Sequence, residues 1–152
     1  MSSKFVPDIG VGAYLMMHGF KAVGRRGKNI HFEAADPSAS KDFDRLYIEY
    51  LSSPYHQFDH YLMALKKMPD ICPDNPARYN KSVPDLGIGA YEMMHGFKVV
   101  GRRGKNVFFA VEDDDGLKEF DRLHREFPNS PYHTFDHYIM ALKKVPECMI
   151  DG

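Results

Sequence analysis

The stretch Val23-Gly24-Arg25-Arg26-Gly27-Lys28-Asn29 decides the fold expected for this chain, because it returns unchanged as Val100-Gly101-Arg102-Arg103-Gly104-Lys105-Asn106. Each copy places three cations beside two glycines, between runs of residues that favour strands. Glycine accepts the backbone angles of a tight turn, so we predict that each stretch forms the tip of a β-hairpin. Such a tip suits phosphate groups or an acidic protein surface, and it is equally typical of an ordinary solvated turn.

The repeated stretch lies within a longer internal duplication. Residues 4–70 align with residues 81–147 without a gap, and about 43 of the 67 aligned positions are identical. We therefore predict two copies of one unit, repeat 1 and repeat 2, joined by a linker at residues 71–80, within a proline-rich stretch from Met68 to Pro84. A unit of about 70 residues seldom builds a sufficient core alone, so we expect the copies to pack as a pseudo-twofold pair. A further homodimer stays open.

Composition and charge limit the classes of function. The chain has 152 residues, 43% of them hydrophobic and 27% charged, with a formal net charge of −1. Such a chain has no global field that would draw it onto nucleic acid or an anionic membrane, so any anion site must be a local patch. We expect no membrane span and no signal peptide, because no apolar run is long enough. Cys72 and Cys148 are too few for a disulfide framework, which favours free thiols in a cytoplasmic protein.

An apolar helix is expected to start after Asp8, a residue suited to an N-cap. Its core face is predicted to hold Ile9, Ala13, Met16 and Phe20. The opposite, rear face is also apolar, which indicates burial on both sides, although the second copy has Glu92 where the first has Leu15. We interpret this rear face and its counterpart as a contact between copies or with a partner, formed by Val11, Tyr14, Leu15, His18, Ile88, Tyr91 and His95.

The remainder of each copy predicts a hairpin and two further helices. In the hairpin's second arm, Ile30, Phe32 and Ala34 alternate with polar residues, as in a half-buried strand. Residues 33–40 and the acidic run at residues 112–116 are expected to be loops, the acidic run serving as a helix-starting turn rather than a calcium loop. The third helix is expected to start at Ser53 and to bury Phe58, Tyr61, Leu62 and Leu65. This order predicts an α+β fold whose two hairpins could join in one antiparallel sheet.

The leading candidate site is the pair of hairpin tips. Backbone N–H groups near Gly27 and Gly104 could add donors for a phosphate oxygen. Among the aromatic residues, Phe108 is best placed to stack on a base. The six cations of this candidate site are Arg25, Arg26, Lys28, Arg102, Arg103 and Lys105.

A second candidate is a repeated histidine motif in the third helix of each copy. Histidines four residues apart share a helix face, a spacing that zinc sites use. The motif lacks a third ligand, and Lys67 nearby would repel a cation, so a solvent-facing or partner-facing surface is the default. The metal candidates are His56, His60, His133 and His137. We expect no cofactor and no enzymatic activity, because the chain has no nucleophile motif and no phosphate-binding glycine loop.

The second copy carries a wider pattern that resembles a small uncharacterised domain family of bacteria, plasmids and bacteriophages, usually found as one copy per chain. The pattern is Asp85, Ala90, Met93, Gly96-Phe97-Lys98, Gly104-Lys105-Asn106-Val107-Phe108-Phe109, Glu112-Asp113, Leu117, Phe127, Asn129, and Phe135 through Ala141-Leu142-Lys143. The resemblance implies a phage or bacterial accessory protein without catalytic residues. This chain departs from the family in its two fused copies and in its histidine motif.

Three functions follow as hypotheses. The first is a non-enzymatic protein of a bacterial host cell that binds nucleic acid, or a phosphate-rich ligand, through the paired basic tips. The second is a protein-interaction module, such as an inhibitor of a host protein, that uses its apolar helix faces. The third is a metal-binding protein that uses the histidine pairs.

Overall fold

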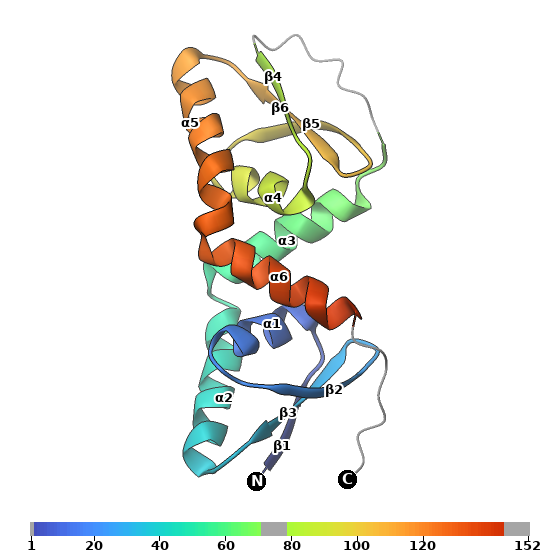
Figure 1. The fold of residues 1–152 in the computed structure, drawn as a ribbon, viewed down its shortest axis with the longest axis vertical. Coiled ribbons are helices and arrows are strands. Elements are labelled where there is room, and N and C mark those ends of the chain that lie inside the picture. Colours follow the sequence, from blue (N-terminus) through green and yellow to red (C-terminus); the bar gives the residue numbers. More distant parts are fainter. Residues whose placement is uncertain (1, 71–78, 145–152) are drawn as a thin grey trace. The chain divides into compact units, whose positions relative to one another are not determined.

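A computed structural model of the chain, which describes residues 2–70 and 79–144, has an α+β fold of helices and two small antiparallel sheets (Figure 1). The first part of the chain forms β1 (Ser2–Val6), α1 (Ile9–Met17), β2 (Ala22–Arg26), β3 (Asn29–Ala34), α2 (Pro37–Tyr50) and α3 (Pro54–Lys67). The second part repeats this order as β4 (Tyr79–Val83), α4 (Leu86–Met94), β5 (Lys98–Arg103), β6 (Asn106–Val111), α5 (Asp114–Glu126), the 3-10 helix η1 (Phe127–Asn129) and α6 (Pro131–Lys144).

The chain forms two compact units that do not coincide with the two sequence copies. Unit 1 combines residues 1–56 with residues 134–152, and unit 2 is residues 57–133. Most of α6 therefore belongs to unit 1 and most of α3 to unit 2. Each unit thus contains the third helix of the other sequence copy.

Close contacts at two helical glycines support this exchange of helices. A Cβ atom built on Gly12 of α1 would lie 3.3 Å from Cδ1 of Leu142 in α6. In unit 2, a Cβ atom on Gly89 of α4 would lie 3.1 Å from Cδ1 of Leu65 in α3. The absence of a side chain at each glycine lets the exchanged helix approach closely.

Each hairpin belongs to a three-stranded sheet of its own. The strand orders are β1-β3-β2 and β4-β6-β5, and all pairs are antiparallel. The suggestion that the two hairpins join in one sheet is therefore wrong for the described strands, because β2 and β3 belong to one sheet and β5 and β6 to another. Strands β1 and β4 were not expected from the sequence. The linker expected at residues 71–80 overlaps the first two residues of β4, and residues 71–78 lie outside the described part.

One face of each sheet supplies the core. Ile30, Phe32 and Ala34 are buried in β3, which confirms the alternation expected for this arm. The same positions of β6 are also buried, and Phe43 and Phe120 pack on the sheets from α2 and α5, with ring centroids 5.5 Å from Phe32 and 5.2 Å from Phe109. The helix starts follow their caps, since Asp8 accepts a hydrogen bond from the Gly10 amide at 3.2 Å.

The two faces of α1 are buried to a different extent than the sequence indicates. Of the expected core face, Ala13 is buried, whereas Ile9, Met16 and Phe20 are only half-buried. The rear-face residues Tyr14 and Leu15 are almost fully buried within unit 1. The rear face is more buried because Tyr14 packs against rings of its own unit, which belong to Tyr50 and Tyr55.

The acidic run at residues 112–116 begins a helix, as expected. Asp113 is the N-cap of α5 and accepts a hydrogen bond from the Gly116 amide at 2.6 Å. Asp114 and Asp115 lie in the first turn, where the positive end of the helix dipole favours carboxylates. The loop expected at residues 33–40 is shorter, because α2 already starts at Pro37.

Within residues 2–70 and 79–144, no helix has the length and hydropathy needed to cross a membrane.

Candidate nucleic-acid interface

The repeated basic stretch forms a tight hairpin turn in both units, as predicted. In unit 1, Arg26 pairs with Asn29, so that Gly27 and Lys28 make a two-residue loop. Gly27 has a φ of +61° and Gly104 a φ of +59°, and no other type of residue in the described part has a positive φ. A two-residue hairpin loop with glycine first matches the twist of the strands. The glycines are therefore required by the backbone of the turn.

One arginine of each tip caps the end of a helix and is not directed at solvent. In unit 1, Nη1 of Arg25 donates to the carbonyl oxygens of Leu142 at 3.2 Å and Lys143 at 3.1 Å, at the end of α6. In unit 2, Nη1 of Arg102 donates to the carbonyl oxygens of Leu65, Lys66 and Met68, at the end of α3, at 2.7–3.3 Å. The last carbonyls of a helix lack partners within it and carry the negative end of its dipole. Arg25 and Arg102 therefore stabilise the fold, and the sequence did not reveal this role.

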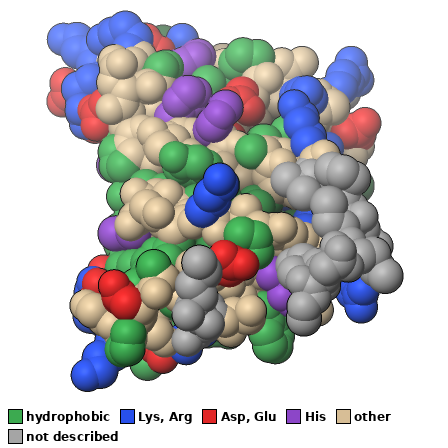
Figure 2. All heavy atoms as spheres, turned by 60° about the horizontal axis from the view of Figure 1, so that its bottom comes forward, with side chains coloured by type: hydrophobic (Ala, Val, Ile, Leu, Met, Phe, Trp, Pro, Cys, Tyr) green, Lys and Arg blue, Asp and Glu red, His purple; other side chains and the backbone are tan. Residues whose placement is uncertain are grey.

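The other four cations of the tips are exposed. They are Arg26 and Lys28 in unit 1, and Arg103 and Lys105 in unit 2. One amide expected to bind phosphate is already used, because the Gly104 N–H donates to Oδ1 of Asp70 at 3.2 Å. The face in Figure 2 shows Lys and Arg side chains scattered among acidic and hydrophobic ones, as the near-neutral net charge suggests.

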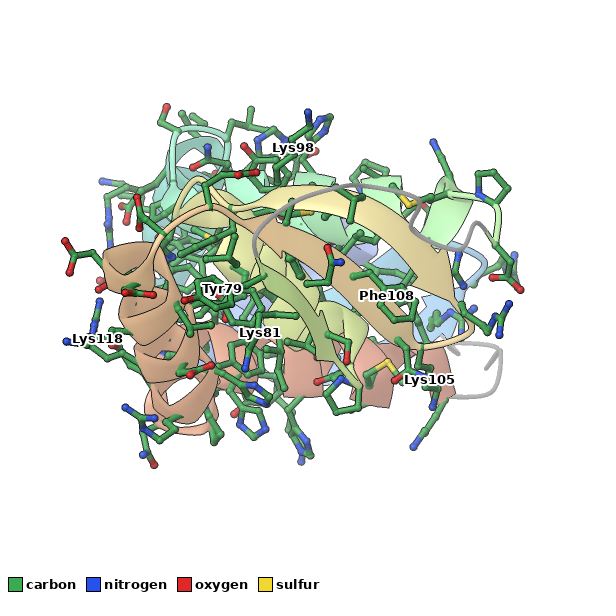
Figure 3. All side chains as sticks on the ribbon, turned by 90° about the horizontal axis from the view of Figure 1, so that it is seen from above. Tyr79, Lys81, Lys98, Lys105, Phe108 and Lys118 are labelled. Carbon is green, nitrogen blue, oxygen red and sulfur yellow. The ribbon has the colours of Figure 1, made fainter. Side chains whose placement is uncertain are left out.

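The outer face of the sheet in unit 2 adds an aromatic ring and a further cation. Phe108 of the central strand β6 is opposite Ser82 of β4 and Gly101 of β5, and its side chain is half-buried. Lys98, at the start of β5, pairs with Ala110 and is exposed. Figure 3 shows Phe108 on this face, with Lys105 beside it at the end of the hairpin and Lys98 towards the other end of the sheet.

The corresponding face of unit 1 has different side chains. His31 occupies the position that Phe108 has in unit 2, and it is opposite Phe5, whose ring centroid is 5.8 Å away. Glu33 occupies the position of Ala110 and is exposed. The face of unit 1 thus carries a carboxylate and a paired ring, whereas that of unit 2 carries neither.

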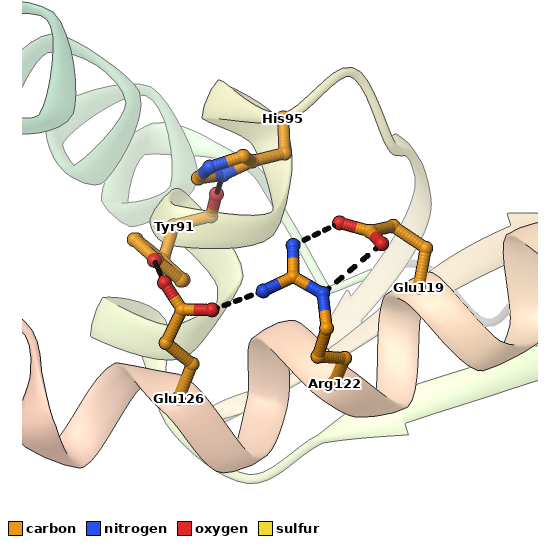
Figure 4. A network of polar contacts seen from close by, with 5 residues as sticks. All are labelled: Tyr91, His95, Glu119, Arg122 and Glu126. Atoms are coloured by element: carbon orange, nitrogen blue, oxygen red, sulfur yellow. Dashed lines mark hydrogen bonds and ion pairs between the residues drawn. The ribbon is translucent and has the colours of Figure 1, made fainter.

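Behind the sheets, a similar polar network links α1 with α2 in unit 1 and α4 with α5 in unit 2. In unit 2, the hydroxyl of Tyr91 donates to Oε1 of Glu126 at 2.7 Å, and Arg122 bridges Glu126 and Glu119 (Figure 4). In unit 1, the hydroxyl of Tyr14 donates to Oε1 of Glu49 at 2.7 Å. Burial and the adjacent carboxylate raise the pKa of Tyr14 to about 12, and the same causes raise the pKa of Tyr91.

Glu92 is the main electrostatic irregularity of the described part. Its side chain is fully buried, and neither carboxylate oxygen has a hydrogen-bond partner. Burial, together with the negative charges of Asp121 and Glu119, raises its pKa to about 8, although Arg122 opposes this shift. The carboxyl group of Glu92 is therefore protonated at neutral pH.

The apolar rear face of α1 and α4, expected to be a partner interface, is mostly covered inside the units. Val11, Tyr14, Leu15 and Tyr91 are each at most 3% exposed, so these four side chains offer almost no surface to an external partner. Ile88 is half-buried. His18 and His95 are exposed at the ends of their helices, where Nδ1 of each ring lies 2.9 Å from a backbone oxygen of the same helix.

The four candidate metal ligands lie on α3 and α6, and all are exposed: His56, His60, His133 and His137. The rings of His56 and His133 contact those of Tyr50 and Phe127 edge-on, with centroids 5.4 Å and 5.5 Å apart. Across residues 2–70 and 79–144, no group of three or more His, Cys, Asp or Glu side chains could hold a metal ion.

Comparison with protein-family models, with curated proteins and with solved structures finds no match. The function of the chain is therefore inferred from its own residues.

Proposed function

We propose that this chain is a non-enzymatic protein that binds nucleic acid through the tips of its two hairpins. The observation that carries the proposal is the pair of exposed cations at each tip, Arg26 with Lys28 and Arg103 with Lys105. Lys and Arg side chains contribute most of the affinity for a phosphate backbone, by releasing its condensed counterions.

The rigid support of each tip favours binding over a merely solvated turn. Arg25 and Arg102 tie the hairpins to helix ends, so the exposed cations extend from an ordered backbone. A cation held on an ordered support loses less conformational freedom when it contacts a phosphate. Nearby acids limit the strength of the site, since Asp70 lies against the second tip.

The test is the affinity for a fluorescent single-stranded oligonucleotide and a duplex of the same sequence, measured by anisotropy across salt concentrations. Four phosphate contacts predict a log–log salt slope of about −3 for a single strand. Changing Lys28 and Lys105 together to Glu should weaken binding at least tenfold and flatten the slope. Lys118→Glu is the matched control for the single variant Lys105→Glu, because it makes the same charge change on α5, away from the hairpin tip (Figure 3).

Two results would overturn the proposal. One is a lack of binding to either oligonucleotide at low salt. The other is an equal loss of affinity in the Lys118→Glu variant and in the Lys28→Glu and Lys105→Glu variants, because such a loss would reflect only overall charge.

A further inference from the structure

The outer face of the sheet β4-β6-β5 presents one aromatic ring among small side chains. Phe108 is opposite Ser82 on one side and Gly101 on the other, so the two residues paired with it carry no large side chain. In the described part of the chain, Phe108 makes no ring–ring contact, whereas Phe109 on the buried face packs against Phe120 at 5.2 Å. Phe108 is half-buried, so part of its ring stays accessible on this face.

Cations border this ring towards both ends of the sheet. Lys98 lies at the start of β5 and Lys105 at the hairpin tip, and both are exposed. The strand β5 between them spans about 20 Å at the usual rise per residue, which is enough for a few nucleotides of an extended strand. The other positions that share this face through their strand pairing are uncharged or basic: Asn80, Ser82, Gly101, Arg103, Asn106 and Ala110.

We propose that this face binds single-stranded nucleic acid, with a base stacked on Phe108 and backbone phosphates at Lys98 and Lys105. This inference rests on the proposed function and narrows it to single strands. In a duplex, the flat face of each internal base is covered by its neighbours, so a ring on a sheet can stack only on an unpaired base. The positive charge of the face favours an anion, and the ring of Phe108 favours a ligand with aromatic bases.

The same face in unit 1 is not suited to this ligand. Its one exposed phenylalanine, Phe5, is on the edge strand β1 and packs beside His31. Glu33 lies where unit 2 has Ala110 and would repel a phosphate. Unit 1 therefore contributes only the charge of its tip, and Phe5 serves as the matched control for Phe108.

The chain contains no tryptophan, which makes a direct test possible. In the full-length Phe108→Trp variant, the introduced indole is the only one, and a base stacked on it quenches its fluorescence. The probes are an oligothymidylate of about ten nucleotides, a length suited to one such face, an abasic strand of the same length, and a duplex. We expect quenching by the oligothymidylate only, and no quenching in the matched Phe5→Trp variant.

Affinity provides the second measurement. Phe108→Ala should weaken binding of the oligothymidylate about tenfold and leave binding of the abasic strand unchanged, because one stacked base contributes about 1–3 kcal/mol. Phe108→Tyr keeps a ring and should bind as the wild type does, which separates loss of stacking from damage to the sheet. Thermal melting of each variant checks its fold.

The outcomes distinguish this inference from the function on which it rests. If Phe108→Trp is not quenched and Phe108→Ala binds normally, while the Lys28→Glu and Lys105→Glu variant still loses affinity, stacking is wrong and tip binding stands. Stronger binding of the duplex than of the single strand would also overturn the stacking proposal. If no variant changes binding, both proposals fail.

Discussion

Leu15 and Glu92 occupy the same position in α1 and α4, and both side chains are fully buried. Around them the two helices share their Asp cap, their close-packed glycine and a tyrosine bonded to a glutamate. A site suited to leucine therefore also accommodates a glutamate of similar length, provided that the carboxyl group stays protonated. Equal burial in two related sites therefore has unequal energetic consequences, because transfer of a charged group out of water is costly, whereas transfer of a methyl group is favourable.

The largest expected effect is the removal of this buried carboxyl group. The pKa of Glu92 is about 8 in the folded chain, against an ordinary 4.5. Between these two pH values the unfolded chain releases the proton and the folded chain keeps it, so the free energy of unfolding falls as pH rises. Glu92→Leu should abolish this loss and stabilise the protein at alkaline pH by on the order of 4 kcal/mol. Urea denaturation from about pH 5 to about pH 9 measures the difference between variant and wild type.

Two control variants sharpen this prediction. Glu92→Gln removes the titration and should flatten the pH dependence without supplying the apolar contacts of leucine. Leu15→Glu places a carboxyl group in unit 1 and should create there the pH dependence that Glu92→Leu removes from unit 2. If wild type and Glu92→Leu show parallel stability profiles across this pH range, Glu92 is not buried in the protonated form.

The exchange of third helices is the next comparison to test. Leu142 of α6 and Leu65 of α3 are each 1% exposed, and they approach α1 at Gly12 and α4 at Gly89. Leu142→Ala should destabilise unit 1 by about 3 kcal/mol, because it removes buried methyl groups and leaves a cavity. Hydrogen exchange should show lost protection in α1 and β3, although Leu142 lies in the second sequence copy.

The mirror variant, Leu65→Ala, should lower protection in α4 and β6 instead. If each variant affects the sequence copy that carries it, the third helices are not exchanged in solution. A joint loss of protection in both units from either variant would mean that they unfold as one cooperative body.

The capping arginines should have the next smaller effect. Arg25→Ala and Arg102→Ala each leave helix-end carbonyls without a charged donor, and we expect each to lower the free energy of unfolding by about 2 kcal/mol. Lysine should rescue only part of this loss, because it lacks the planar fork that reaches several carbonyls. Urea denaturation measures the free energy of unfolding of these arginine variants and of Lys118→Glu, a substitution of an exposed residue on α5. An arginine-to-alanine variant as stable as this control would show that the capping contacts are negligible.

Much of the local structure could be predicted from the sequence because it depends on neighbouring residues. The hairpin turn follows from Gly27 and Gly104, the start of the first helix from Asp8, and the buried face of β3 from its alternating residues. The features that were missed depend on distant partners. The sequence of β4 is typical of a linker, because its strand conformation depends on pairing with β6. The boundaries of the two sequence copies likewise do not show to which unit α3 and α6 belong.

The candidate site was predictable to a similar extent. The sequence identified the cations of the tips, but it did not show which are exposed and which cap a helix. Arg25 and Arg102 donate to carbonyl oxygens that lie far from them along the chain. The apolar rear of α1 was correctly expected to be covered. What covers it could not be predicted, because Tyr50 and Tyr55 reach it only in the folded unit.

The smallest effect should come from the tyrosine–glutamate bonds, where the two units are alike. Tyr91→Phe and Tyr14→Phe each remove one hydroxyl that donates to a glutamate at 2.7 Å. Each should lower the free energy of unfolding by about 1 kcal/mol, the usual net contribution of such a bond. Equal losses, measured by urea denaturation near neutral pH, would mean that the units differ in energy at Glu92 and not in the surrounding network. A loss for Tyr91→Phe much larger than that for Tyr14→Phe would instead show that the hydroxyl of Tyr91 also stabilises the buried carboxyl group of Glu92, since Tyr91 and Glu92 are adjacent on α4.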